Sequence, residues 1–133
     1  ERRRECGWGL YEALGIAKGD REASARQAAE NFTMFGAPHV AIVTSDEALG
    51  VYGAVDCGAY VGNFLLAAQS LGVATIAQAA LAAYPQVLRE VLGIAADRSI
   101  VCGISFGLAD PEHPANRFRT QRADPGDCVT WRD

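Results

Sequence analysis

The sequence predicts a domain that mixes helices with strands, of the α/β or α+β class. Two short apolar runs without alternation, residues 39–44 and 99–106, are typical of strands inside a sheet. A long apolar stretch between them, residues 54–71, exceeds the usual length of a strand and favours a helix. With 133 residues, 50% of them hydrophobic, the chain is long enough for a core of its own, so we expect residues 1–133 to be a single domain.

Two helices are expected before the first strand. The first covers about residues 6–15 and the second about residues 20–34. Apolar residues of the first recur at helical spacing: Leu10, Ala13 and Leu14. Asp20 can cap the free amides at the start of the second helix, and Gly36 can adopt the left-handed conformation that often follows a helix end.

The stretch 54–71 is apolar on nearly every face of the helix that it predicts. Its main polar residues lie seven positions apart in one thin stripe: Asp56, Asn63 and Ser70. A helix on the surface of a globular protein shows a broad polar face, so this helix is expected to be buried on almost all sides. In a chain of this size, burial of a whole helix usually requires a second chain.

Two alternatives to a second chain are open for this helix: a core helix of a single chain and a membrane span. Asp56 near its start and Asn63 in its middle argue against a span, because polar groups are unfavourable inside a bilayer. Gly58 and Gly62 favour a close contact between two helices, because glycine lets two backbones approach each other.

The elements after the long helix are shorter. Gly72 ends that helix, and residues 73–76 are expected to form a short extended piece. Pro85 suits the first turn of a further helix, which runs over residues 86–92 and is closed by Gly93. After the second strand, residues 110–133 are expected to form an extended arm that contains three prolines: Pro111, Pro114 and Pro125.

The charge of the chain gives no reason to expect a nucleic acid or an anionic membrane as a partner. The formal net charge is −4. Half of the basic residues nevertheless gather near the two ends of the chain: Arg2, Arg3, Arg4, Arg117, Arg119 and Arg122. These arginines are either solvated tails or a pair of anion-binding arms, and the composition leaves both interpretations open.

The four cysteines are far apart and form no C-x-x-C motif. They are Cys6, Cys57, Cys102 and Cys128. Cys57 and Cys102 lie in strongly apolar runs and are interpreted as small core residues. This usage predicts a reduced, cytoplasmic protein without a disulfide framework or a zinc site.

One short motif could carry hydrolase chemistry. Residues 103–107 match the G-x-S-x-G pattern, in which the serine must lie on a sharp turn between a strand and a helix. Here Ser105 lies inside the predicted strand, and the prolines that follow cannot open a helix at once. His39 and His113 are the only histidines that could serve as a base. No dinucleotide or P-loop motif is present, so we predict no catalytic side chain and no metal ligand.

Four segments, in the right order, resemble the FMN-dependent nitroreductase family. They are residues 35–41, 60–75, 99–107 and 116–122. The resemblance implies an α+β fold, with a central sheet flanked by helices and the long apolar helix packed against its twin in a homodimer. It also implies two FMN molecules at the dimer interface, each touching both chains.

The same resemblance assigns residues to the flavin site. A turn at Ile76, Ala77, Gln78 and Ala79 matches the segment whose backbone lies along the isoalloxazine ring. Arg119 and Arg122 match the basic residues that hold the FMN phosphate, and a phosphate requires such charged donors. The implied activity passes hydride from NAD(P)H through FMN to a nitroaromatic, a quinone or a similar flat acceptor, and the cofactor supplies the chemistry.

The chain departs from the family at its beginning. Family members start with an Arg-Arg-Ser-type stretch that grips the flavin, followed by a helix and strands that have no match here. The sequence therefore resembles the C-terminal part of a family member. The alternative is a non-catalytic dimeric fragment that keeps the helix contact but lacks a complete flavin site.

Overall fold

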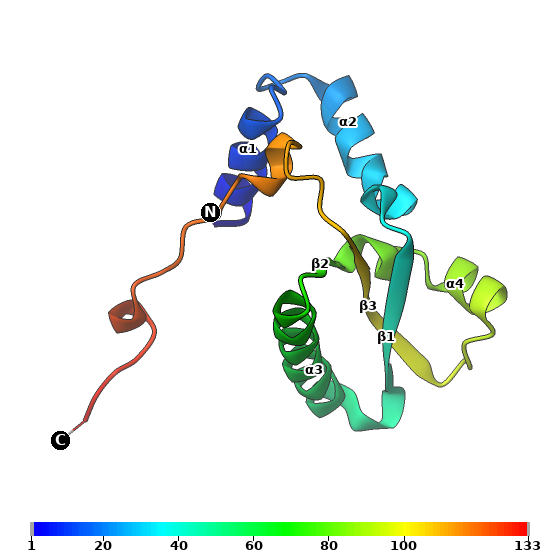
Figure 1. Cartoon of the computed structure of the whole chain (residues 1–133). Helices are drawn as coiled ribbons and strands as arrows, with labels where there is room; N and C mark the ends of the chain where they lie inside the picture. Colours follow the sequence, from blue (N-terminus) through cyan, green and yellow to red (C-terminus); the bar gives the residue numbers. More distant parts are fainter. Residues whose placement is uncertain (1, 133) are drawn as a thin grey trace. The chain divides into compact units, whose positions relative to one another are not determined.

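The computed structural model describes residues 2–132 and contains two compact units (Figure 1). One unit is Ala25–Ala109, and the other combines the residues that precede it with those that follow it. The first unit holds a sheet with helices on its faces, and the second unit holds the first helix and the C-terminal tail. The expectation of a single domain stays a prediction.

The sheet has three antiparallel strands in the order β1–β3–β2. The strands are β1 (His39–Asp46), β2 (Ala74–Gln78) and β3 (Arg98–Gly107). The main helices are α1 (Arg2–Ala13), α2 (Arg21–Ala29), α3 (Gly50–Ser70) and α4 (Pro85–Leu92). Short 3₁₀ helices are η1 (Glu30–Gly36), η2 (Glu47–Leu49), η3 (Ala79–Ala83), η4 (Pro114–Asn116) and η5 (Pro125–Asp127).

Both predicted strands are present, but only β3 is internal. Within the described residues β1 forms one edge of the sheet, so its predicted internal position is wrong there. The extended piece expected at residues 73–76 is a full strand, β2, because pairing with β3 continues as far as Gln78.

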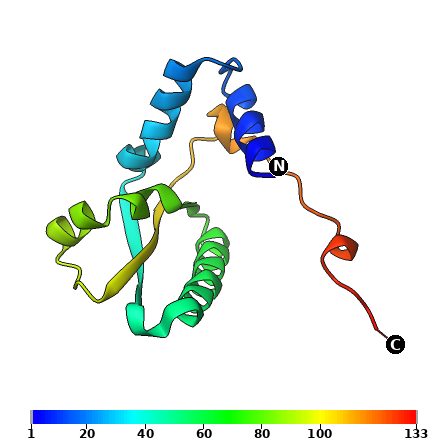
Figure 2. The same cartoon turned by 180° about the vertical axis from the view of Figure 1, so that it is seen from behind.

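Helix α3 and the segment after β2 cover opposite faces of the sheet. Successive side chains of a strand point to opposite faces, so Cys102 and Gly103 of β3 face different neighbours. Cys57 of α3 packs with Cys102 in the buried core, whereas Leu81 of η3 lies against Gly103. Figures 1 and 2 show α3 on one side of the sheet and α4, which follows η3, on the other.

In this chain α3 is exposed over most of its surface. Only Gly53 and Cys57 are buried. Several of its large apolar side chains are exposed: Val51, Tyr52, Val55, Tyr60 and Leu66. Residues 2–132 therefore do not bury α3 on almost all sides. The interpretation of α3 as an ordinary core helix is wrong for this part of the chain. By length and composition alone, Glu47–Ser70 would suffice to span a membrane.

The local signals at helix ends are confirmed in three places. The Asp20 carboxylate accepts a hydrogen bond from the Ala23 amide at 2.9 Å and caps α2. Pro85 is the first residue of α4. Gly93 directly follows the last residue of α4 and has the left-handed conformation, with φ of 66°. Gly50, with φ of 53°, begins α3 four residues before the predicted start.

Helix α2 ends earlier than predicted, and η1 replaces its last turns. Side chains of η1 bond to the backbone of the preceding turn: Asn31 donates to the Ala28 carbonyl at 3.0 Å, and Thr33 to the Glu30 carbonyl at 3.1 Å. Such bonds compete with a regular helix. Met34 and Phe35 then take left-handed conformations, with φ of 57° and 53°, before Gly36 does so as well.

The second unit brings α1 and the C-terminal tail together. Helix α1 begins before the predicted residue 6. A side chain at Gly9 would meet the ring of Phe118, with the added carbon 2.8 Å from Cε2, so the tail approaches the helix backbone closely. Apart from η4 and η5, the described residues after Ala109 contain no helix or strand. The expectation of an extended arm over residues 110–133 stays a prediction.

Candidate functional site

The segment assigned to the flavin ring is the end of a strand and the start of a 3₁₀ helix, not a turn. Ile76, Ala77 and Gln78 belong to β2, and Ala79 begins η3. The reason for the difference is that Ile76, Ala77 and Gln78 all pair with β3. The periodicity of the sequence could not reveal this pairing. The four residues lie together, as expected.

This segment presents a free backbone edge and small side chains. Strand β2 pairs with β3 on one side only, so within residues 2–132 no strand covers its other edge. An edge strand leaves N–H and C=O groups available to another molecule. Ile76, Ala77 and Ala79 are exposed, and two of these three carry only a methyl group. A flat molecule can therefore approach the backbone closely.

Gln78 differs from its neighbours because its side chain is buried, with 2% of the residue exposed. Its Nε2 donates to the Asn31 carbonyl at 2.9 Å and lies 3.3 Å from Asn31 Oδ1. Its Oε1 accepts a hydrogen bond from the hydroxyl of Ser105, which is fully buried. The side chain therefore anchors the segment to η1 and β3.

A second contact fixes the segment just beyond Ala79. Leu81 is 4% exposed, and its Cδ1 occupies the space that a side chain at Gly103 would need. Glycine at position 103 thus allows η3 to lie directly on β3. The exposed surface of residues 76–79 rests on this packed layer.

Arg119 and Arg122 are exposed in the C-terminal tail, in the other unit. Arg119 donates to the carbonyl oxygens of Asn116 and Phe118, at 2.7 and 2.8 Å. Arg122 donates to the hydroxyl of Thr120 and to the Gln121 carbonyl. Within the described residues no carboxylate accepts from either guanidinium, so their positive charges are open to an anion.

The other terminal arginines are placed differently. Arg117 is paired with the Glu112 carboxylate at 2.8 Å, so its charge is already compensated. Arg2 and Arg4 are exposed on α1, and the side chain of Arg3 lies outside the described part of the chain. The structure therefore places Ile76–Ala79 in one unit and Arg119 with Arg122 in the other.

The hydrolase interpretation of residues 103–107 is excluded. Ser105 is fully buried inside β3, and no helix follows Gly107 directly. His39 is exposed at the start of β1, where its ring stacks on Phe106 with centroids 5.3 Å apart. The role of Ser105 is to donate to Gln78, which the sequence analysis missed.

A sequence signal for this missed pair does exist. Gln78 and Ser105 are isolated polar residues in apolar runs that both form strands. Buried polar side chains must find partners, and two such residues in neighbouring strands are natural partners for each other. The contribution of Asn31 carries no comparable signal, because the atom that accepts from Gln78 at 2.9 Å is a main-chain carbonyl oxygen, which every residue has.

Cys57 and Cys102 are buried, which confirms their interpretation as core residues. Burial, with a smaller contribution from Cys57, raises the pKa of the Cys102 thiol. A thiol that stays protonated is a poor nucleophile. Cys102 is therefore not a candidate for catalysis.

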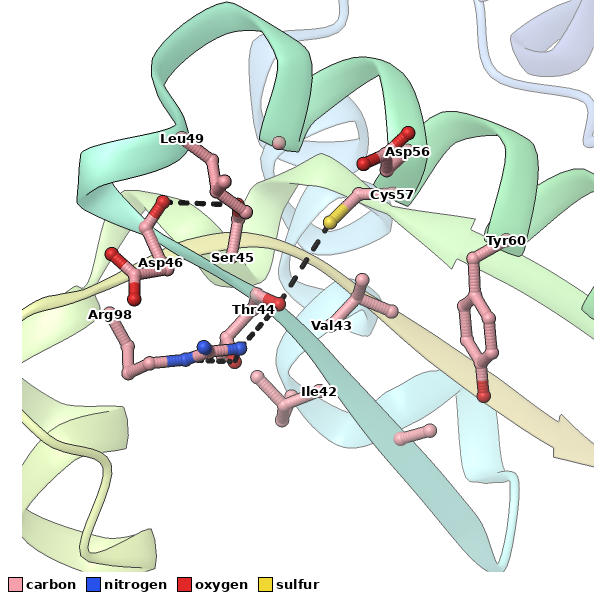
Figure 3. Close-up of a pocket in the computed structure, with 12 residues that line it drawn as sticks. Ile42, Val43, Thr44, Ser45, Asp46, Leu49, Asp56, Cys57, Tyr60 and Arg98 are labelled. Atoms are coloured by element: carbon pink, nitrogen blue, oxygen red, sulfur yellow. Dashed lines mark hydrogen bonds between the residues drawn. The ribbon is translucent and has the colours of Figure 1, made fainter.

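An open groove of about 460 Å³ lies between β1 and α3, away from all predicted site residues (Figure 3). Three charged residues line it: Asp46, Asp56 and Arg98. The Arg98 guanidinium donates to the carbonyl and hydroxyl oxygens of Thr44, both at 2.9 Å. The Asp46 carboxylate accepts from the Ala48 amide at 2.8 Å and caps η2. The charged groups of Arg98 and Asp46 are thus used in hydrogen bonds to residues that line or flank the groove.

Each of the two groups of residues, taken by itself, fits one part of FMN. The free edge of residues 76–79 and the small side chains of Ala77 and Ala79 suit a flat ring that takes hydrogen bonds from the backbone. The uncompensated guanidinium groups of Arg119 and Arg122 suit a phosphate, which forms short charge-assisted bonds with arginine.

Comparisons with known proteins place the chain in a family. A model of the Nitroreductase family matches residues 10–108. The chain is 38% identical over 132 residues to a 4-nitrobenzoate reductase of Nocardioides sp. (strain LMS-CY), a match that covers 98% of the chain and 53% of that protein. The chain therefore spans about half the length of this curated relative.

Two solved structures share the fold. One is the FMN-dependent nitroreductase NfnB from Mycobacterium smegmatis in complex with NADPH, with a TM-score of 0.93 and 33% identity. The other is the FMN and NADPH-dependent nitroreductase NfnB from Sphigopyxis sp. strain HMH, with a TM-score of 0.96 and 30% identity. Each match covers 99% of this chain and 59% of the solved one. The family match, these two structures and the sequence relative together show that the chain belongs to the nitroreductase family.

Proposed function

We propose that the chain forms part of the flavin site of an FMN- and NAD(P)H-dependent oxidoreductase that reduces nitroaromatics, quinones or similar flat acceptors. One observation carries the proposal: residues 76–79 offer an exposed backbone edge with small side chains at Ala77 and Ala79, and the buried side chains of Gln78 and Leu81 anchor this segment to the rest of its unit. The names of the relatives, a 4-nitrobenzoate reductase and two FMN-dependent nitroreductases, support it.

The residues of this chain bind and orient, and none of them needs to be a catalytic acid or base. FMN, when bound, supplies the two-electron chemistry between NAD(P)H and the acceptor. The backbone of Ile76, Ala77, Gln78 and Ala79 would hold the isoalloxazine through hydrogen bonds. Arg119 and Arg122 would hold the phosphate through charge-assisted bonds.

The proposed assembly is a homodimer in which α3 packs against its twin. Its exposed apolar side chains support this contact. Gly58 and Gly62 support it further, because a Cβ added at either position meets nothing within 4 Å in this chain, so the fold of the single chain gives no reason for glycine there. We further propose a cytoplasmic protein that binds neither nucleic acid nor membrane.

The test is direct. The purified protein should be yellow and should oxidise NADPH or NADH when 4-nitrobenzoate or a quinone is supplied, with one FMN per chain by absorbance. A colourless protein that does not bind added FMN and does not oxidise NAD(P)H would refute the proposal.

The second candidate is a dimeric protein without a complete flavin site of its own. The chain spans 53% of the curated relative and 59% of the solved structure. Titration of the 133-residue chain with FMN separates the two candidates. Weak binding by a dimeric chain supports the second, and tight stoichiometric binding excludes it.

A further inference from the structure

Gln78 places a polar amide in the interior of the larger unit. The residue is 2% exposed, although Ala77 and Ala79 on either side of it are exposed. A buried amide is tolerated only where its donors and its acceptor find partners. The side chain therefore points to the core, while the neighbouring backbone remains at the surface.

The partners of this amide come from two distant segments. Asn31 lies 47 residues before Gln78 and offers its main-chain carbonyl to Nε2 at 2.9 Å. Ser105 lies 27 residues after Gln78 and donates its hydroxyl to Oε1. Gln78 is opposite Gly103 in the sheet, so Ser105, two residues further along, shares its face of the sheet. Three segments thus converge on one amide.

Packing alone does not account for this arrangement. An apolar side chain of the same volume would fill the space without requiring partners, and such a replacement can be neutral or stabilising. Hydrogen bonds are directional, however, and bonds at both ends of the amide fix its plane. Because the amide is fixed, the peptide groups on either side of Gln78 are fixed as well.

We infer that Gln78, oriented by Ser105 and Asn31, is a positioning residue that holds the peptide groups of residues 77–79 against the edge of the bound flavin. This inference rests on the proposed function, which sets that backbone along the isoalloxazine. A displacement of about 1 Å in a positioned group can lower a rate by about a hundredfold. A side chain that never touches the flavin can therefore govern turnover.

The experiment compares three variants of the FMN-loaded protein. Gln78→Met keeps an unbranched side chain of similar volume but removes both hydrogen bonds, whereas Ser105→Ala removes one hydroxyl. We expect Gln78→Met to shift the reduction potential of bound FMN and to lower kcat roughly 10- to 100-fold. Ser105→Ala should act in the same direction and more weakly. Combining the two should add little to Gln78→Met alone, because both remove the same bond.

Ser45→Ala is the matched control. Ser45 is also a buried serine of the sheet, 7% exposed, but its hydroxyl donates to the Asp46 carbonyl at 3.2 Å and makes no bond to Gln78. The Ser45→Ala variant should lose about as much thermal stability as Ser105→Ala does. The reduction potential of its bound FMN and its kcat should be unchanged.

The outcomes separate the inference from the proposed function. A folded, FMN-loaded Gln78→Met protein with unchanged potential and kcat would overturn the inference and leave the proposed function intact. Failure of the unmodified protein to bind FMN would overturn both. Should Gln78→Met not fold, equal potentials and kcat values for Ser105→Ala and Ser45→Ala would overturn the inference.

Discussion

The hydroxyl of Ser45 on β1 occupies the space that a side chain at Gly53 on α3 would need. A methyl group at Gly53 would overlap Ser45 Oγ and would lie 3.2 Å from Ser45 Cβ and 3.0 Å from Leu49 Cβ. Both Ser45 and Gly53 are buried. The helix can approach the sheet this closely only because residue 53 has no side chain.

Gly53→Ala is therefore expected to destabilise the protein by about 1–3 kcal/mol, the usual effect of overpacking. The loss should appear although alanine favours helix over glycine by about 1 kcal/mol. Urea unfolding measures it. Adding Ser45→Ala removes the overlapping hydroxyl and should restore much of the loss. An equal loss with and without Ser45→Ala would contradict the packing argument.

Gly58→Leu with Gly62→Leu should turn the proposed dimer into a monomer. A Cβ added at either position meets nothing within 4 Å in the single chain, so the fold should survive. Leucine also has a higher helix propensity than glycine. Sedimentation velocity gives the mass. Gln86→Leu, which adds an exposed apolar residue on α4, is the control and should remain dimeric. A dimeric double variant would place the interface elsewhere.

Arg119→Ala and Arg122→Ala should each weaken FMN binding roughly 10- to 100-fold, the effect of losing one charge-assisted hydrogen bond. Arg117→Ala is the matched control because Glu112 already pairs with that guanidinium. Fluorescence titration with FMN measures the affinities. Riboflavin, which lacks the phosphate, should bind all four proteins with similar affinity. A loss of riboflavin binding in the Arg119 or Arg122 variant would argue against a phosphate contact.

Two of the four thiols should react much faster than the others. Cys6 and Cys128 are exposed, whereas Cys57 and Cys102 are buried. Burial raises the pKa of Cys102, so this thiol keeps its proton, and remains slow to react, at pH values above about 8.5 where an ordinary thiol ionises. Alkylation with iodoacetamide, followed by mass spectrometry, gives the rates. Modification of Cys102 as fast as Cys128 in the folded protein would contradict the buried position.

Local signals predicted several elements correctly. Asp20 caps α2, and α4 lies between Pro85 and Gly93, because each of these residues acts through the backbone of its own turn. The end of α2 could not be predicted in this way. Met34 and Phe35 adopt left-handed conformations that neither side chain favours, so contacts elsewhere in the unit decide that turn.

One segment of the candidate site could also be predicted from the sequence. The resemblance selected Ile76–Ala79, but it described a turn where pairing with β3 makes a strand. The anchoring of Gln78 by Asn31 was beyond reach, because no periodicity joins residues that are 47 positions apart. The edge position of β1 was missed for the same reason, since strand order is a property of the whole sheet.

The exposure of α3 has a consequence for how its sequence tolerates change. Of its 21 residues, only Gly53 and Cys57 are buried by the chain itself. Substitutions at exposed positions such as Val55 or Leu66 should be nearly silent in a selection for folding alone, because surface changes usually shift stability by less than about 0.5 kcal/mol. A selection for flavin-dependent growth should reject the same substitutions. Two mutational scans of this protein should therefore disagree most strongly along this one helix.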